Sequence, residues 1–187
     1  MSILLTTTAM LSQMNTALAD SQAVVFVGNN WDGTVNVFNS QNYSKVGVIN
    51  VVPDKQARMK EILLNPIKLV AFQAVRNLIG EGHDQLVDDM YSSNDGKLLI
   101  ASRPSFADVV AIDIATGKIV WRFVVDGYRS DHMALSPDGT KVAVSASTGN
   151  VVHILDVNTG KQVGKFASGN SPHENVYSKD GSKIYHA

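Results

Sequence analysis

The sequence has no cysteine, few aromatic residues and no excess of charge of either sign. The absence of cysteine from all 187 residues excludes disulfides, thiolate zinc sites and cysteine nucleophiles. Charged residues make up 18% of the chain, and 16 basic residues balance 17 acidic ones. This balance gives no electrostatic reason to expect nucleic acid or an anionic membrane as a partner. The motifs H-E-x-x-H, G-x-S-x-G, P-loop and G-x-G-x-x-G are also absent, so no reaction follows from local sequence.

The N-terminal segment is mildly apolar and free of charge. The stretch "ILLTTTAMLSQMNTALAD" has no charged residue before Asp20 and contains Ala17-Leu18-Ala19, an A-x-A cleavage pattern. We therefore predict a signal peptide at residues 1–19 and a periplasmic or secreted protein. A basic stretch at its start is missing, so a helical or disordered tail is the alternative. The segment is too short and too rich in threonine for a membrane span, and we expect no transmembrane protein.

An internal repeat organises the rest of the chain. "SNDGKLLIAS" begins at Ser93, "SPDGTKVAVS" at Ser136 and "SKDGSKIYHA" at Ser178, with spacings of 43 and 42 residues, and "IATGK" and "VNTGK" keep the same step. Short β-branched runs lie between these markers, and the DG and TG pairs suit tight turns. The pattern predicts antiparallel four-stranded sheets at Asp88–Val125 and Asp131–Ala167.

The pattern "SPDGxxxxVS…VxxxDxxTGKxxxxF" resembles the YVTN-type β-propeller repeat, whose propellers are related in shape to WD-repeat and quinoprotein propellers. The resemblance covers residues 23–52 and 88–187. It implies an all-β propeller domain at 20–187, with about three and a half four-stranded blades from a larger, seven-bladed ring. It also implies that a missing C-terminal half or an edge-pairing partner covers the open sheet edges. Function does not follow, because this fold hosts many activities.

One segment, residues 53–83, interrupts the repeat and predicts a helical insertion. Apolar residues recur at helical spacing before and after Pro66, which should split the helix with Asn65 as the N-cap of the second part. Gly80 suits the end of that helix. A packed brace, a gate over a pocket and a partner-binding surface all remain open as roles.

Polar residues recur at equivalent places just before the repeated serine. The sequence reads DDM at 88–90, DHM at 131–133 and HEN at 173–175. In the propeller that the repeat resembles, these residues enter the innermost strand of successive blades, so we expect them to converge at one channel mouth. Two arginines belong to loops on the same rim. The predicted ligand-binding set is Asp89, Arg103, Arg129, Asp131, His132, His173, Glu174 and Asn175.

Within this set, the candidates for binding a divalent metal are Asp89, His132, His173 and Glu174, because imidazole and carboxylate groups are common ligands. A purely structural role at the start of each strand is the alternative. We expect a binding or scaffold module for a small molecule or a protein, and the competing hypothesis is a metal-assisted lactonase or lyase. His153 lies in mid-strand and is read as structural. The sequence around Trp121 resembles the tryptophan-docking motif of quinoprotein propellers. We expect Trp121 to pack between repeats, and we do not infer a quinone from it.

Overall fold

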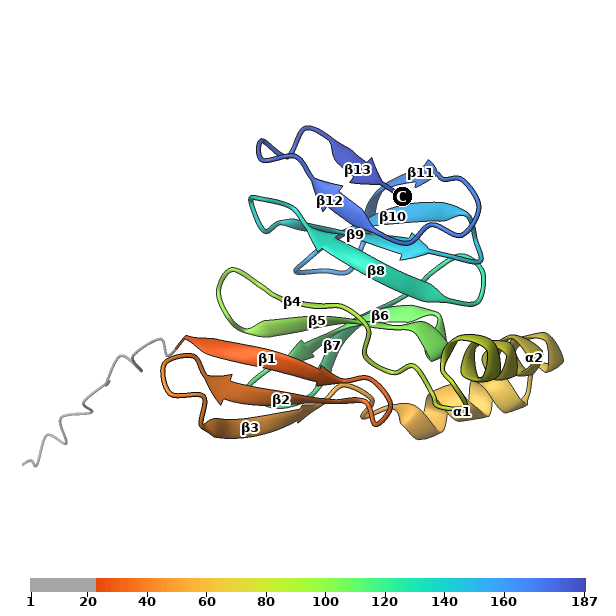
Figure 1. Ribbon diagram of the computed structural model, residues 1–187, viewed down its shortest axis with the longest axis horizontal. Helices are drawn as coiled ribbons and strands as arrows, with labels where there is room; N and C mark the ends of the chain where they lie inside the picture. Colours follow the sequence, from red (N-terminus) through yellow and green to blue (C-terminus); the bar gives the residue numbers. More distant parts are fainter. Residues whose placement is uncertain (1–22) are drawn as a thin grey trace, which may run out of the picture.

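The computed structural model describes residues 23–187, so the expected signal peptide at 1–19 lies outside the described residues. The described chain is mostly β structure and contains four antiparallel sheets that follow one another in sequence (Figure 1). Within each sheet, strands that are consecutive in the chain pair with each other. This is the meander that the short, regularly spaced turns predicted.

The sheets differ in their number of strands. The first has three: β1 (Val24–Asn29), β2 (Thr34–Asn39) and β3 (Lys45–Asn50). The second has four: β4 (Met90–Ser92), β5 (Leu98–Arg103), β6 (Asp108–Asp113) and β7 (Ile119–Val124). The third also has four: β8 (Ser130–Leu135), β9 (Lys141–Ala146), β10 (Val151–Asp156) and β11 (Gln162–Ala167). The last has two: β12 (Asn175–Tyr177) and β13 (Ile184–His186). The two four-stranded antiparallel sheets confirm the sequence prediction.

The repeated S-x-D-G sequence forms the same turn each time. In the middle copy, the Asp138 carboxylate accepts hydrogen bonds from the Ser136 hydroxyl at 2.6 Å and from the Thr140 backbone N–H at 3.0 Å. These bonds lower the pKa of Asp138 to about 2. Asp95 and Asp180 make the equivalent bonds in the other copies. The turn therefore fixes the register of each first hairpin through local polar contacts.

The hydrophobic core lies between successive sheets. On β5, Leu99 and Ala101 face the three-stranded sheet and pack with Val35 of β2, whereas Ile100 faces the following sheet and packs with Met133 of β8. Both faces of the second sheet are therefore buried. This explains why β5 and β6 read as nearly continuous apolar runs instead of alternating ones.

Trp121 of β7 joins the second sheet to the third. Its indole N–H donates to the backbone oxygen of Val157 at 2.9 Å, and its ring lies over Gly160, where a Cβ would come within 2.5 Å of the ring. Gly160 also has a φ of +65°, so glycine is required there both by space and by backbone conformation. The contact agrees with the packing role that we expected for Trp121.

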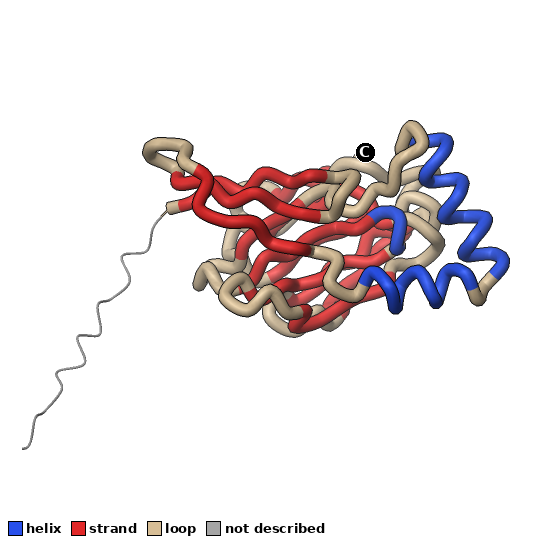
Figure 2. The backbone as a smooth tube through the Cα atoms, turned by 90° about the horizontal axis from the view of Figure 1, so that it is seen from below, coloured by secondary structure: helices blue, strands red, loops and turns tan. Residues whose placement is uncertain are grey.

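Helices occupy the segment where the sequence predicted them. They are α1 (Lys55–Leu63) and α2 (Pro66–Ala74), and α2 continues into a π-helical stretch, Val75–Ile79. The Asn65 side chain caps α2 by accepting from the backbone N–H groups of Ile67 and Lys68, both at 3.1 Å. The two helices lie at one end of the sheets (Figure 2).

Gly80 follows the helical segment at a place where only glycine fits. A Cβ at this position would come within 2.1 Å of the His83 backbone oxygen.

No single helix among residues 23–187 has the length and apolar character needed to cross a bilayer. Together, Lys55–Leu63 and Pro66–Ile79 reach that length and composition, but they are bent by 114°.

Candidate functional site

The first strands of neighbouring sheets are bridged at one end by hydrogen bonds. The backbone N–H of Met133 in β8 donates to Asp89 Oδ2 at 2.8 Å, and the Tyr91 hydroxyl donates to the Met133 oxygen at 3.0 Å. On the other side, Asn175 Nδ2 donates to the backbone oxygen of His132 at 3.3 Å. The equivalent positions of three successive repeats therefore lie next to one another.

A bulge at the start of β8 determines how its polar side chains point. Ser130 pairs with Ala146 and Met133 pairs with Val144, so β8 has one residue more than β9 across this interval. The extra residue falls at Asp131 and His132. In a regular strand, adjacent side chains point to opposite faces, and a bulge changes this alternation. It allows two consecutive polar residues to serve the same site.

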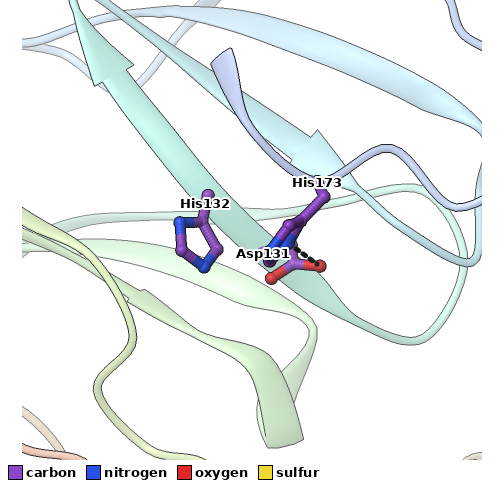
Figure 3. A group of neighbouring side chains, drawn as sticks. All are labelled: Asp131, His132 and His173. Atoms are coloured by element: carbon purple, nitrogen blue, oxygen red, sulfur yellow. Dashed lines mark ion pairs between the residues drawn. The ribbon is translucent and has the colours of Figure 1, made fainter. Parts of the chain in front are cut away.

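Asp131, His132 and His173, which we call the histidine cluster, come together at this bulge (Figure 3). Asp131 Oδ2 lies 3.4 Å from His173 Nδ1, and the two imidazole rings meet edge to face with centroids 4.1 Å apart. One ligand atom from each of the three residues lies within 4.8 Å of the others. Asp131 is almost fully buried, while the imidazoles are open to solvent. The cluster can therefore be approached from outside.

Two further carboxylates flank His132. Its Nδ1 lies 3.2 Å from Glu174 Oε2 and 3.7 Å from Asp89 Oδ2. The Glu174 side chain is half exposed, whereas Asp89 already accepts from the Met133 backbone. Glu174 is thus the freer of the two to turn toward a bound group.

Arg129 closes one side of the cluster. Its guanidinium pairs with Asp131 and donates to Ser147 Oγ at 3.1 Å. A hollow of about 300 Å³ opens at this place and is lined by Ile79, Arg129, Asp131, Ser147, Thr148, Ser171 and His173. Ile79 ends the helical segment, so the insertion borders this hollow.

Asp88 belongs to this site, although we did not include it in the predicted set. Burial raises the pKa of Asp88 to about 6, the neighbouring Asp131 adds to the rise, and the basic groups of His132 and Arg129 oppose it. Asp88 Oδ2 and Asp131 Oδ1 are buried without a donor from any described residue. The repeat could have shown this role, because Asp88 is the equivalent of Asp131.

Two predicted site residues, Arg103 and Asn175, are buried and already hydrogen-bonded, and their assignment as ligand-binding residues is corrected. Arg103 is fully buried and bonds both oxygens of Asp108, at 2.7 and 2.8 Å, and Asp54 at 2.6 Å. Asn175 is 2% exposed and donates to Ser145 Oγ at 2.8 Å. A side chain whose polar atoms are buried and already paired cannot reach a ligand. Arg103 and Asn175 therefore position the backbone and the helical insertion.

His153 has the structural surroundings that we expected. Its Nε2 accepts from the backbone N–H of Asp126 at 3.1 Å, and its Nδ1 donates to Gln162 Oε1 at 2.7 Å. Burial lowers its pKa, which favours the neutral ring. His153 therefore has no nitrogen free for a ligand.

A larger hollow, of about 750 Å³, lies between the third sheet and the β12–β13 hairpin, at the end with the S-x-D-G turns. Its acidic residues, Asp138 and Asp180, are held by hydrogen bonds within their own turns. It contains none of the imidazoles and is not the site favoured here.

No known protein family and no curated protein sequence matches the chain. Among solved structures, it is similar to the hydrazine synthase of Kuenenia stuttgartiensis, with 25% identity and a TM-score of 0.47. The similarity covers 52% of this chain and only 28% of the length of that one. A similarity of this extent assigns neither a fold family nor an activity to the chain.

Proposed function

We propose that the chain is part of an exported, YVTN-type β-propeller that acts as a binding module, and that the histidine cluster binds a divalent cation. The observation that carries the proposal is the convergence of Asp131, His132 and His173, with one ligand atom of each within 4.8 Å of the others. The three residues come from two repeats, so the site depends on the packing of neighbouring sheets. The repeated turns and consecutive meander sheets support the propeller interpretation.

The donor atoms favour a particular class of cation. Two imidazole nitrogens and a carboxylate oxygen suit borderline ions such as Zn²⁺, Ni²⁺ or Co²⁺ better than Ca²⁺, which prefers a shell of oxygens. The unpartnered oxygens of Asp88 and Asp131 add negative charge beneath the cluster. Binding weakens on acidification, because protonated imidazoles have no lone pair for a metal.

Calorimetric titration with Zn²⁺ and with Ca²⁺ tests the proposal. We expect the unmodified chain to bind Zn²⁺ more tightly than Ca²⁺, and we expect the His132→Ala, His173→Ala double variant to lose Zn²⁺ binding by at least about tenfold. His83→Ala is the matched control, because His83 stacks on Trp31 at 3.9 Å and lies outside the cluster. Equal Zn²⁺ affinity of the double variant and the unmodified chain would exclude the site.

A metal-assisted lactonase or lyase is the second candidate function. The half-exposed Glu174 favours it, because a solvent-accessible carboxylate 3.2 Å from His132 can act as an acid or base beside a bound cation. Glu174→Gln separates the two functions. An enzyme would lose turnover of a lactone while keeping Zn²⁺ binding, whereas a binding module shows no turnover in either form.

A further inference from the structure

The helical insertion carries several large apolar side chains that the other described residues leave exposed. Leu63 ends α1 and Leu64 follows it, and these residues are 61% and 74% exposed. Ile67 and Val70, in the first turns of α2, are 63% and 70% exposed. Leu78, in the π-helical stretch that continues α2, is 83% exposed. These five residues form the apolar face. The junction of the two helices, where four of them lie, is at the outer edge of the molecule (Figure 2).

The opposite side of the helices is docked onto the sheets. Ile62 and Phe72 are buried in a cluster with Val52, Leu86 and Phe106. The Asp54 carboxylate just before α1 pairs with the buried Arg103 at 2.6 Å. The helices are therefore fixed to the domain by one side and present the other. Such an arrangement suits lying on a surface, and the 114° bend between the helices opposes a straight crossing of a bilayer.

The unpaired charges beside the junction of the two helices are positive, although the chain as a whole is balanced. Residues 59–75 contain only three charged side chains. Glu61 is neutralised by Arg58 at 2.6 Å and lies 3.6 Å from Arg122. Lys60 and Lys68 are exposed and make no ion pair within residues 23–187. The local charge therefore complements an anionic surface.

A tyrosine completes the pattern at the edge of the face. Tyr128, in the loop before β8, is 41% exposed. It lines a shallow apolar hollow of about 420 Å³ with Pro66, Ile67, Val70 and Ala71. Aliphatic side chains flanked by lysine and tyrosine are typical of segments that enter the boundary between lipid headgroups and acyl chains.

We infer that this face docks onto anionic lipid bilayers, with Leu63, Leu64, Ile67 and Val70 entering the headgroup region and Lys60 and Lys68 contacting lipid phosphates and carboxylates. The insertion thereby holds the sheets, and the histidine cluster bordered by Ile79, at a membrane surface. The inference concerns a different surface from the cation site and does not depend on it.

Vesicle co-sedimentation tests the inference. We expect the chain to bind phosphatidylcholine vesicles containing about 30% phosphatidylserine at least tenfold more tightly than pure phosphatidylcholine vesicles, and to be released by salt. The Leu64→Ser, Ile67→Ser, Val70→Ser variant should lose at least about tenfold of this binding. The Lys60→Gln, Lys68→Gln variant should lose the preference for anionic vesicles and retain weak binding to neutral ones.

The control changes exposed apolar residues elsewhere. Val46 and Val48 on β3 are 52% and 53% exposed, and the Val46→Ser, Val48→Ser variant should bind anionic vesicles as the unmodified chain does. Circular dichroism establishes that each variant is folded. Failure of the folded, unmodified chain to bind anionic vesicles would overturn the inference. So would an equal loss in the control, or self-association through the apolar face without vesicle binding.

Discussion

Two groups of charged side chains in this molecule both pair carboxylates with basic groups, but one is buried and the other is open to solvent. The arginine network consists of Arg58, Arg103, Arg122, Asp54 and Asp108, and it is centred on a guanidinium with no exposed surface. The histidine cluster lies at the bulge of β8, with one buried carboxylate beneath two solvent-accessible imidazoles. Both contain carboxylates paired with basic groups.

The difference lies in whether the polar atoms are satisfied from within. Arg103 donates to Asp108, to Asp54 and to the backbone oxygen of Val51 at 3.1 Å. Its guanidinium group therefore has no free donor for a ligand. Beside the histidine cluster, Asp88 and Asp131 each keep a buried oxygen without a donor. The bonded guanidinium of Arg103 therefore holds the fold together, whereas the free oxygens of Asp88 and Asp131 are acceptors that a proton or a cation can neutralise.

Replacing the arginine of each group by methionine is the strongest test of this contrast. Arg103→Met leaves the fully buried Asp108 and the adjoining Asp54 short of positive charge, and we expect it to lower the free energy of unfolding by about 3–5 kcal/mol. Arg129→Met is the matched change at the histidine cluster. It should cost less than Arg103→Met, because Arg129 is partly exposed and Asp131 keeps its contact with His173. Urea denaturation measures both, and equal losses would contradict the distinction.

The repeat made the strands and their sheets predictable. Serine, aspartate and glycine at fixed spacing determine the turns through local bonds, and these bonds are encoded within a few residues of sequence. The repeat also placed Asp131, His132 and His173 in the wider predicted ligand-binding set, and the structure brings these three side chains together. Whether they bind a ligand stays a prediction. Whether the sheets belong to a ring, and whether the chain is exported, stay predictions.

The errors concerned residues whose partners lie far away in the sequence. Arg103 pairs with Asp54 of the helical insertion, 49 positions earlier. No periodicity in the sequence encodes that contact. The expected loop position of Arg103 therefore wrongly suggested that its side chain would lie at the ligand-binding rim. Asp88 was left out of the predicted set although the repeat makes it the equivalent of Asp131, whereas the rise of its pKa depends on burial that only the packing defines. The bulge in β8 could not be predicted either, because no glycine or other turn residue marks its position in the sequence.

The pH dependence of stability gives a second, smaller test. Because the pKa of Asp88 rises from 3.8 to about 6 on folding, the folded chain holds more protons than the unfolded chain between these values. This group therefore favours folding most at low pH, and its contribution is lost as the pH rises through 6. Asp88→Asn removes the titrating group and keeps the size of the side chain. We expect it to raise the free energy of unfolding at pH 7.5 by about 1–2 kcal/mol.

The measurement is urea denaturation in the presence of a chelator, at pH 4 and at pH 7.5. The variant and the unmodified chain should have similar stability at pH 4 and differ at pH 7.5. Asp89→Asn is the control, because it leaves Asp88 in place and should retain the dependence on pH. A variant whose stability still falls between pH 4 and pH 7.5 as in the unmodified chain would show that Asp88 is not the group responsible.

The smallest effect on stability should come from the imidazoles themselves. His132 and His173 are partly exposed, and their contacts with Glu174 and Asp131 are of the kind that contributes little in water. We expect the His132→Ala, His173→Ala variant to lose less than about 1 kcal/mol in a chelator. Saturating Zn²⁺ should raise the Tm of the unmodified chain and leave that of the variant unchanged, because a ligand stabilises only a folded state that binds it. A large loss in the chelator would place these histidines with Arg103 among the residues that hold the fold together. A small loss of stability in the variant, together with a Tm that Zn²⁺ raises only in the unmodified chain, would assign these histidines to binding.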